Sequence, residues 1–406
     1  MRSRRVRWFA VIGVMACGLF AALPLASATA HGAKKPAHPT GFFVSGQGAV
    51  VKGTNAAAFV RDHNGGEHVV SSVASPSAPG DQGHIVYRTR RPGATKWVSR
   101  AIPGLRPMAG GIRVELHLSY NGSRVFAVID ECDGVFVTDT SLLSQRLPEP
   151  TLVEPLADCT DPPAARPGLS QTAFSVPGSP DQIGVMLPDP DATNATTIFF
   201  GSPGGSFNSS GALPTDDDFT PVQLAFDPRS EKMTVVGYGS DGTNEGVYVT
   251  TSDYYYYDYT NWSTPTLIAS LGQPSADYTI ESIAAYNDAI WVGLLKPATT
   301  GVTRKHALFV QHWSSSNQWI GTIPLAHTTG HDTGLRLSFN PASGHLHAAY
   351  TRVIKSSKSV KSGIFMQTRV NGAWTGVTHL THWYRDRAME FGYTSAGRAV
   401  IGYERG

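Results

Sequence analysis

The amino-acid sequence predicts an all-β protein, a β-propeller built from seven four-stranded blades. Three observations predict it: a recurring short run of aromatic and β-branched residues, a second repeat of two apolar runs joined by a tight turn, and many Gly and Pro residues, 42 and 27 of 406. Gly and Pro are the poorest helix formers. Each repeat occurs seven times, at steps of roughly 40 to 60 residues, the length of one blade. A six-bladed ring is the alternative, if one pair of repeats is not a true pair.

The first repeat is a four-residue run, usually led by glycine or alanine and followed by aromatic and β-branched residues. Such residues favour strands because their side chains pack well on a pleated, half-buried surface. We expect each run to form the third strand of a blade. The seven copies begin at Gly41, His84, Gly134, Thr197, Gly246, Ala307 and Gly363.

The second repeat is a pair of apolar runs separated by a short segment rich in Asn, Asp, Gly, Pro and Ser. These residues favour tight turns, so each pair predicts a hairpin that supplies the first and second strands of a blade. A fourth strand follows the third after a short loop, and a tryptophan often marks it. The hairpins cover residues 57–70, 114–129, 172–187, 223–236, 282–294, 335–350 and 388–403, and the tryptophans are Trp97, Trp262, Trp319 and Trp374.

The order of these pieces predicts how the ring closes. Residues 42–52 are a third and fourth strand without a preceding hairpin, and residues 388–403 are a hairpin without the strands that should follow. Placed side by side, the two ends complete one blade, which leaves no unpaired sheet edge. We therefore expect residues 41–406 to form a single propeller domain.

The first 30 residues predict a secretory signal peptide. Arginines near the N-terminus precede an apolar stretch from Trp8 to Leu25, and small residues up to Ala30 form a cleavage pattern. A retained membrane anchor is an alternative, because about 18 apolar residues just cross a bilayer. Lipidation at Cys17 is another. Residues 31–40 are polar and contain prolines, which predicts a flexible linker. The expected location is outside the cell.

Charge and cysteine content exclude some partners and predict one crosslink. Residues 1–30 hold four Arg and no acid, so their removal turns the net charge of +2 into about −2. No bulk positive charge is left to attract nucleic acid or an anionic membrane. Cys132 and Cys159 remain, and in an exported chain they favour a disulfide, with two unpaired thiols as the alternative. Neither has the C-x-x-C spacing of a metal site.

Two passages resemble the secreted bacterial propellers of the sialidase and Asp-box superfamily. In residues 363–374 and 84–97, an apolar run is followed by a threonine and then by a tryptophan. The resemblance covers roughly residues 41–406 and implies a propeller fold. It also implies, as one possible activity, a glycoside hydrolase or lyase. The chain contains neither an intact S-x-D-x-G-x-T-W motif nor an F/Y-R-I-P motif, so the likeness is one of pattern.

Candidate ligand-binding residues lie near the starts of the first strands, which we expect to be innermost. Arg113, Arg336 and Arg387 are three such residues, and the planar guanidinium suits an anionic group because it forms paired hydrogen bonds. The alternative is that these side chains face solvent or pair between neighbouring strands.

Candidate catalytic residues are acids and a tyrosine in the same region. If the protein is a hydrolase, Tyr278 and Glu281 are the expected nucleophile and base, and Glu115 or Asp332 is the expected acid. The sequence does not decide whether any catalysis occurs.

A run of tyrosines in the loop between the third and fourth strands of one blade is the most unusual local feature. Exposed Tyr and Trp side chains are rigid and amphipathic, and they serve as platforms for sugars or anchors for proteins. The alternative is a hairpin whose tyrosines pack on neighbouring blades. The candidates are Tyr254, Tyr255, Tyr256, Tyr257 and Trp262.

No metal or cofactor is predicted. The acidic triplet 216–218 lacks a spaced ligand set, and the histidines around His345 and His347 are interpreted as ordinary surface residues. The leading prediction is a secreted, non-catalytic propeller that binds carbohydrate or an extracellular protein at the channel mouth. A sialidase-like hydrolase and a structural protein of the cell envelope are the alternatives.

Overall fold

The computed structural model divides the chain into two units, Met1–Ala37 and His38–Gly406, and every residue it describes belongs to the second. The described residues are 42–44, 57–62, 64–73, 84–105, 113–119, 121–131, 134–140, 147–155, 173–176, 178–188, 196–213, 219–227, 229–253, 262–270, 279–297, 306–314, 318–325, 332–340, 342–353, 362–381, 386–393 and 399–405. Regular structure in these ranges is entirely β-strand. None of them forms a helix long and apolar enough to span a membrane.

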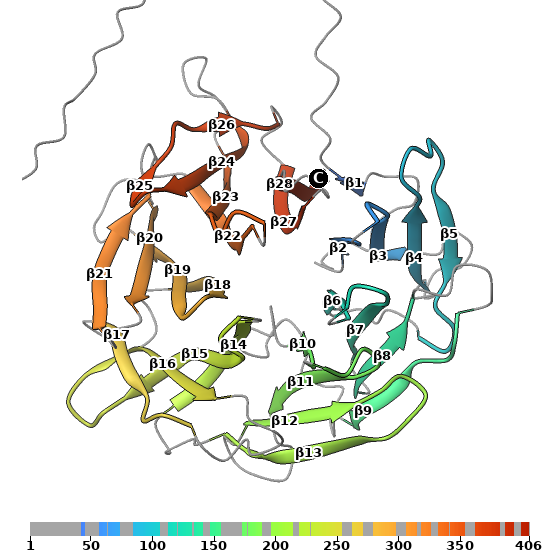
Figure 1. Cartoon of the computed structure of the whole chain (residues 1–406), viewed down its shortest axis with the longest axis horizontal. Coiled ribbons are helices and arrows are strands. Elements are labelled where there is room, and N and C mark those ends of the chain that lie inside the picture. Colours follow the sequence, from blue (N-terminus) through green and yellow to red (C-terminus); the bar gives the residue numbers. More distant parts are fainter. Residues whose placement is uncertain are drawn as a thin grey trace, which may run out of the picture. The chain divides into compact units, whose positions relative to one another are not determined.

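Five sheets are complete blades, meaning four antiparallel strands that follow one another in chain order (Figure 1). In each blade the first two strands are a predicted hairpin and the third is a predicted aromatic run. The first two blades are β2 (Ala57–Arg61), β3 (Glu67–Val73), β4 (His84–Arg90) and β5 (Val98–Ala101), then β6 (Arg113–Leu118), β7 (Val125–Glu131), β8 (Gly134–Asp139) and β9 (Thr151–Pro155). The third is β10 (Ala173–Ser175), β11 (Ile183–Pro188), β12 (Thr196–Gly201) and β13 (Phe207–Ala212). The fourth is β14 (Phe219–Asp227), β15 (Lys232–Ser240), β16 (Glu245–Asp253) and β17 (Thr266–Ser270). The fifth is β18 (Thr279–Tyr286), β19 (Ala289–Pro297), β20 (His306–Ser314) and β21 (Gln318–Pro324).

Two further sheets depart from the blade pattern. One has five strands, because its outer strand is broken into two short pieces that both pair with the third strand. The other has three strands and contains both ends of the described chain. The first is β22 (Asp332–Phe339), β23 (Leu346–Arg352), β24 (Gly363–Val370), β25 (Ala373–Trp374) and β26 (Thr378–His379); the second is β27 (Asp386–Tyr393), β28 (Ala399–Arg405) and β1 (Phe42–Val44).

The prediction of seven blades, with six as the alternative, is therefore wrong, because the described residues form five. The repeats correctly place strands in all seven sheets, but a strand repeat does not guarantee four continuous strands. In the shared sheet, β1 contributes three residues and pairs with β28 in parallel, from Phe42 opposite Gly402 to Val44 opposite Glu404. The expected second strand of that end, up to residue 52, lies outside the described residues.

The sheets follow one another around a ring in which the first strand of each is innermost (Figure 1). Each first strand lies beside the first strand of the next sheet, and β27 lies beside β2. The protein is thus an all-β fold with a β-propeller arrangement. In an antiparallel sheet the turns after the first and third strands lie at one end, which we call the turn end.

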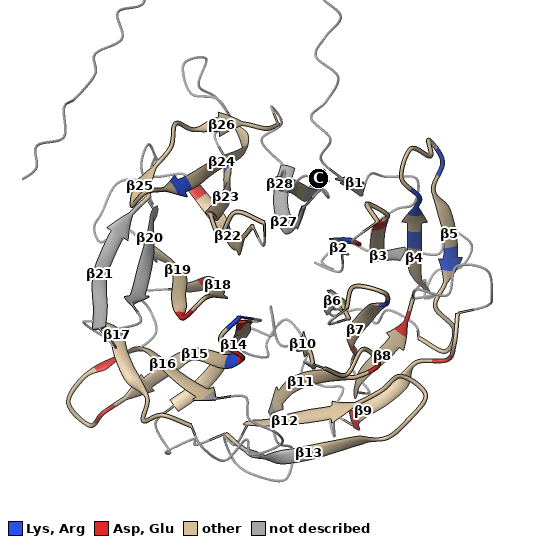
Figure 2. Cartoon of the chain, viewed as in Figure 1, with Lys and Arg blue, Asp and Glu red and all other residues tan. Residues whose placement is uncertain are grey.

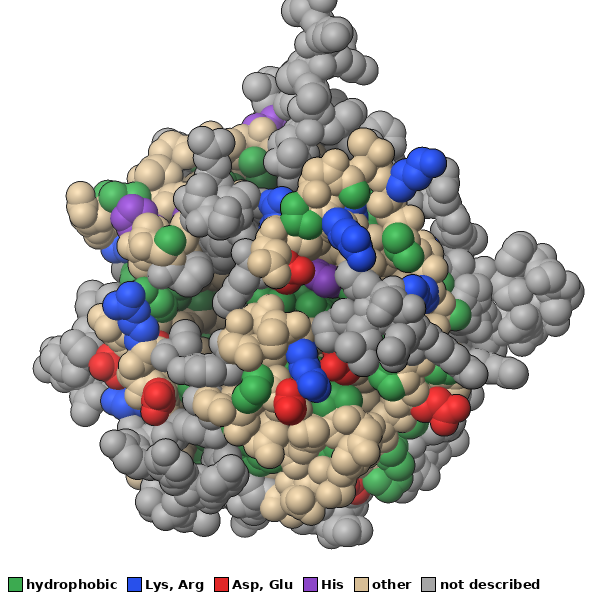
Figure 3. All heavy atoms as spheres, turned by 45° about the vertical axis from the view of Figure 1, so that its right-hand side comes forward, with side chains coloured by type: hydrophobic (Ala, Val, Ile, Leu, Met, Phe, Trp, Pro, Cys, Tyr) green, Lys and Arg blue, Asp and Glu red, His purple; other side chains and the backbone are tan. Residues whose placement is uncertain are grey.

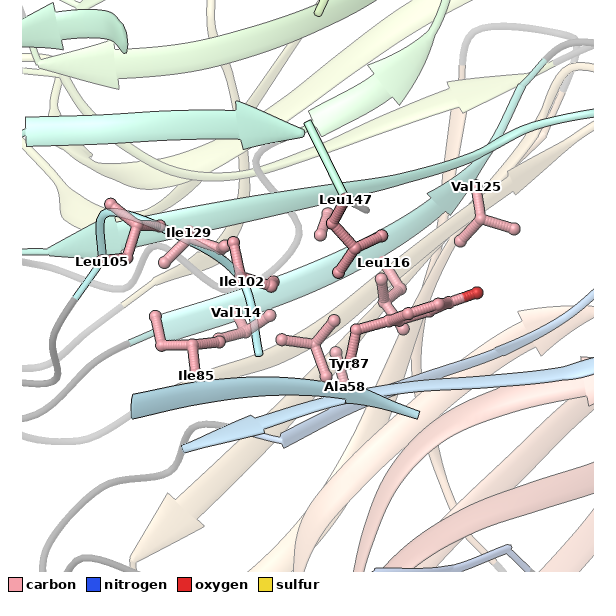
Figure 4. Close-up of a cluster of buried hydrophobic side chains, with 12 residues drawn as sticks. Ala58, Ile85, Tyr87, Ile102, Leu105, Val114, Leu116, Val125, Ile129 and Leu147 are labelled. Atoms are coloured by element: carbon pink, nitrogen blue, oxygen red, sulfur yellow. The ribbon is translucent and has the colours of Figure 1, made fainter. Parts of the chain in front are cut away.

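Apolar clusters between successive sheets hold the ring together. In Figure 4, Ile85 and Tyr87 of β4 lie against Val114 and Leu116 of β6, and all four are buried. Similar clusters join the later sheets. Because each sheet is covered on both faces, a central strand such as β23 is buried along its whole length. This explains why second strands such as β7 and β11 consist mainly of consecutive apolar residues.

Candidate functional site

A polar cluster lies where the innermost strands β18 and β22 meet. The Nη1 atom of Arg336 donates to the main-chain oxygen of Glu281 at 3.0 Å and to that of Leu335 at 3.1 Å. The hydroxyl of Tyr238, from the neighbouring blade, accepts a hydrogen bond from the N–H of Ile280 at 3.1 Å. We call Tyr238, Glu281 and Arg336 the Glu281 cluster. It brings together side chains from three sheets.

Two β-bulges create this arrangement. The pairing of β18 with β19 shifts register between Ile280 and Ser282, and that of β22 with β23 shifts between Thr333 and Arg336. A bulge breaks the alternation of side chains and redirects them. Gly334, within the second bulge, has φ +63, a left-handed conformation that glycine adopts without strain. The bulges therefore direct Glu281 and Arg336 toward the junction of the two strands.

The environment of Glu281 favours its protonated form. Burial raises the pKa of this carboxyl, while the charge of Arg336 and the N–H groups of Leu335 and Gly334 act in the opposite direction without cancelling the effect. Burial also raises the pKa of the Tyr238 hydroxyl, and the charge of Glu281 adds to that increase. The cluster therefore contains a guanidinium, a carboxyl group whose pKa is raised by burial, and a phenol whose pKa is also raised.

Asp332 forms a buried ion pair with Arg352. Its two carboxylate oxygens accept from Nε and Nη2 of Arg352 at 2.6 and 3.0 Å, and the Asp332 side chain has no exposed surface. The Arg352 guanidinium also lies 4.3 Å above the ring of Phe365. Breaking such a pair would leave an uncompensated buried charge, so this geometry is that of a structural contact.

Glu115 also has a side-chain partner, His117. On β6 its carboxylate lies 2.9 Å from Nε2 of His117, and both side chains are half-buried. Arg113 on β6 and Arg387 on β27 belong to innermost strands, as Arg336 does. Of these three arginines the structure describes only the side chain of Arg336, so the predicted three-arginine grip stays a prediction.

Several predicted residues lie outside the described part of the chain. They are Cys17, Cys132, Cys159, Tyr254, Tyr255, Tyr256, Tyr257 and Tyr278. The disulfide, the lipid anchor and the tyrosine platform therefore stay predictions. Trp262 is described: it is half-buried and packs against the apolar cluster between the third and fourth blades.

Tyr238 is the member of the cluster that the sequence analysis did not single out. It lies on a second strand, whereas the predicted arginine and acid candidates lie at first strands. A signal was present, since Tyr238 stands between Gly237 and Gly239 directly after the apolar pair Val235 and Val236. Glycines beside an aromatic residue often mark a close approach of two chain segments.

No set of three His, Cys, Asp or Glu side chains suited to a metal ion occurs among the described residues. Burial, together with the neighbouring His345, lowers the pKa of His347 to about 4. His347 is therefore a neutral, buried side chain near pH 7, and not the surface histidine that was expected.

Charged side chains are sparse and mixed in sign over the described residues (Figure 2). On the face shown in Figure 3, blue and red side chains are interspersed, and the described atoms form no large patch of one charge. This distribution matches the small net charge of the chain.

No protein-family model matches the chain, and no curated protein matches it. Solved structures resemble it at low identity. The α-L-arabinofuranosidase PaAbf62A from Podospora anserina, in complex with cellotriose, is 9% identical over 82% of this chain and 95% of its own, with a TM-score of 0.38. A GH62 α-L-arabinofuranosidase catalytic domain from Coprinopsis cinerea is 10% identical over 84% and 96%, with a TM-score of 0.38.

The β-propeller domain of the Trilobed protease from Pyrococcus furiosus is 8% identical over 84% of this chain and 87% of its own, with a TM-score of 0.43. Similarities this distant carry no argument about function. The sialidase and Asp-box resemblance also stays a prediction.

Proposed function

We propose that the protein is a secreted, non-catalytic propeller that binds carbohydrate at the Glu281 cluster. The supporting observation is that Asp332 and Glu115, the two predicted acids, are paired with other side chains. Hydrolysis by paired carboxyl groups needs one acid and one base or nucleophile on opposite sides of the scissile bond. Asp332 is buried against Arg352, and Glu115 is bonded to His117. Glu281 is then left without either of the acids proposed as its partner.

The chemistry of the cluster suits sugar hydroxyls. The Arg336 guanidinium donates hydrogen bonds, the Glu281 carboxyl accepts or donates according to its protonation, and the Tyr238 hydroxyl does both. A few polar groups held on rigid strands are typical of a specific binding site. The arginine-rich, apolar leader supports the secreted location. An extracellular protein is the alternative ligand.

A glycan array probed with the full chain tests this proposal, followed by calorimetry with the glycan retained. Arg336→Gln should lower affinity by about tenfold or more, because hydrogen bonds to a charged group are stronger than neutral ones. Arg91→Gln is the matched control, since Arg91 is exposed in a turn far along the chain from the cluster. Retention of no glycan, or equal loss in both variants, would contradict carbohydrate binding at this site.

One observation favours the hydrolase alternative. Burial raises the pKa of Glu281, and a raised pKa is the direction of change expected for a general acid. Incubating the retained glycan with the protein and measuring release of reducing ends separates the two functions. Turnover by the wild type that is lost in Glu281→Gln would show that the protein is an enzyme. Binding without turnover supports the proposal.

A further inference from the structure

A second cluster of interest lies at the turn end, away from the Glu281 cluster. Arg229, in the turn between β14 and β15, is exposed, and its guanidinium lies 5.0 Å above the ring of Tyr286. Tyr286 ends β18, and its ring stacks on Phe339, which ends β22, at a centroid distance of 5.4 Å. Phe339, Tyr286 and Arg229 thus form one stack across three consecutive sheets, with the Arg229 guanidinium at its end.

A second guanidinium is held in the same way. Arg369, near the end of β24, lies 5.0 Å from the ring of Trp291 and 5.6 Å from that of Trp374. Trp291 is buried on β19, and Trp374 belongs to β25. Two indole rings thus lie close to the guanidinium and restrict its position, while its N–H groups remain the atoms that can donate hydrogen bonds. Burial lowers the pKa of Arg369, which reflects partial loss of water around the charge.

The two arginine stacks are neighbours on one interface. Ala284 of β18 pairs with Trp291 of β19, and Tyr286 lies two residues further along the same face. Diagonal neighbours of this kind are about 7–8 Å apart in a sheet. Both stacks therefore lie at the turn end of the interface between the sheets that begin with β18 and β22.

Neither arginine has an acidic partner among the described residues, although other arginines of the protein do. Arg90 pairs with Glu67, Arg124 with Asp139, and Arg352 with Asp332. Stacking fixes the side chains of Arg229 and Arg369, so little rotamer freedom is lost when a ligand binds. The two guanidinium edges are preorganised and form no ion pair with a described carboxylate, although Asp227 and Asp288 lie near the main chain of Arg229, so they form a receptor for anionic oxygens.

We propose that Arg229 and Arg369, held in place by the rings of Tyr286, Trp291 and Trp374, form a second binding surface that takes an acidic polysaccharide. Carboxyl or sulfate groups recur along such a chain and can meet both arginines at once. The net charge of about −2 after loss of residues 1–30 does not attract nucleic acid over long range. The site lies at turns rather than at a sheet edge, so a peptide added as an extra strand does not fit it. This surface is separate from the Glu281 cluster and does not depend on carbohydrate binding there.

Calorimetry of the full chain with polygalacturonate, dextran sulfate and neutral dextran tests the proposal. The wild type should bind one or both polyanions and not dextran, and the preferred polyanion distinguishes carboxyl from sulfate groups. Arg229→Gln and Arg369→Gln should each weaken binding by about tenfold or more, with a larger loss in the double variant. Lys96→Gln removes the same charge from an exposed turn of the first blade and should bind as the wild type does.

A conservative variant separates the effect of the planar guanidinium group from the effect of its positive charge. Arg369→Lys keeps the positive charge but loses the planar edge, so it should bind nearly as weakly as Arg369→Gln. Thermal melting of each variant checks folding, and Arg229→Gln carries the test alone if removal of Arg369 unfolds its sheet. Binding that is unchanged in Arg229→Gln would overturn the proposal. So would equal binding of dextran, or equal binding of duplex DNA with the same arginine dependence.

Discussion

Glycine at the start of the third strand has a clear physical reason at the residue scale. The outer strand of the same sheet approaches so closely that a side chain would overlap its backbone. At Gly134 an added Cβ would lie 2.7 Å from the main-chain oxygen of Glu154. A Cβ added at Gly246 or Gly363 would likewise lie too close to the main-chain oxygen of Ala269 or Thr381, respectively. Close packing of the third strand against the fourth therefore explains why the repeat begins with glycine at these positions.

Gly246→Ala should destabilise the protein by roughly 1–3 kcal/mol, the usual result of adding atoms to a filled site. Its backbone is not in the left-handed region, so the effect is steric alone. Gly376→Ala is the control, because an added Cβ there meets no atom within 4 Å. Urea unfolding monitored by fluorescence gives both midpoints. Equal midpoints for the two variants would contradict this reason for the repeat.

At the scale of elements, Asp227 joins the turns of two neighbouring blades. Its carboxylate accepts hydrogen bonds from Arg229 N at 2.9 Å and Ser230 Oγ at 2.7 Å in its own blade. It also accepts from Asp288 N, in the next blade, at 2.8 Å. Burial alone would raise the pKa of Asp227, but these hydrogen bonds outweigh it and lower the pKa below the usual value. The ionised form therefore stabilises the contact.

Asp227→Asn should lose about 1–3 kcal/mol of stability near pH 7, because hydrogen bonds to a charged acceptor are weakened. A carboxyl whose pKa is lowered by folding contributes stability above its unfolded pKa of about 3.9, and loses it as pH falls through the folded value. The gap between wild type and variant should thus narrow below about pH 4. Asp241→Asn, in an exposed turn within one blade, is the control and should show a smaller change. Unfolding curves at pH 3 to 8 measure both, and a gap that does not vary with pH would contradict the assignment.

The sequence located the strands because each strand has a local cause. Apolar runs and turn residues predicted all seven hairpins, and each is an antiparallel pair in the structure, such as β6 with β7. Contacts across sheets were harder to predict, because they join residues far apart in the chain. Arg336 and Glu281 were both candidates, yet their contact and the part of Tyr238 depend on two bulges that no local pattern marks. The same holds for Asp332, whose partner Arg352 follows 20 residues later.

At the scale of the whole molecule, strand repeats predicted more blades than the structure contains. The break between β25 and β26 and the short parallel strand β1 both lie at sheet edges. Outer strands have few neighbours, so packing constrains their sequence less than it constrains the inner strands. The count of blades therefore depends on the part of the pattern that the sequence encodes most weakly.

The joining of the two chain ends by β1 and β28 can be tested by truncation. Deleting residues 1–37 removes only the first unit and should leave the unfolding midpoint unchanged. Deleting residues 1–44 also removes β1 and exposes the edge of β28 between Gly402 and Glu404. Loss of these few hydrogen bonds should cost on the order of 2 kcal/mol. The open edge should also promote association that grows with protein concentration.

Thermal melting and analytical ultracentrifugation of the two truncations, made from the same expression host, give both readouts. If both have the same midpoint and both stay monomeric, then β1 does not seal the ring. The proximity of β27 to β2 would then be enough to close it.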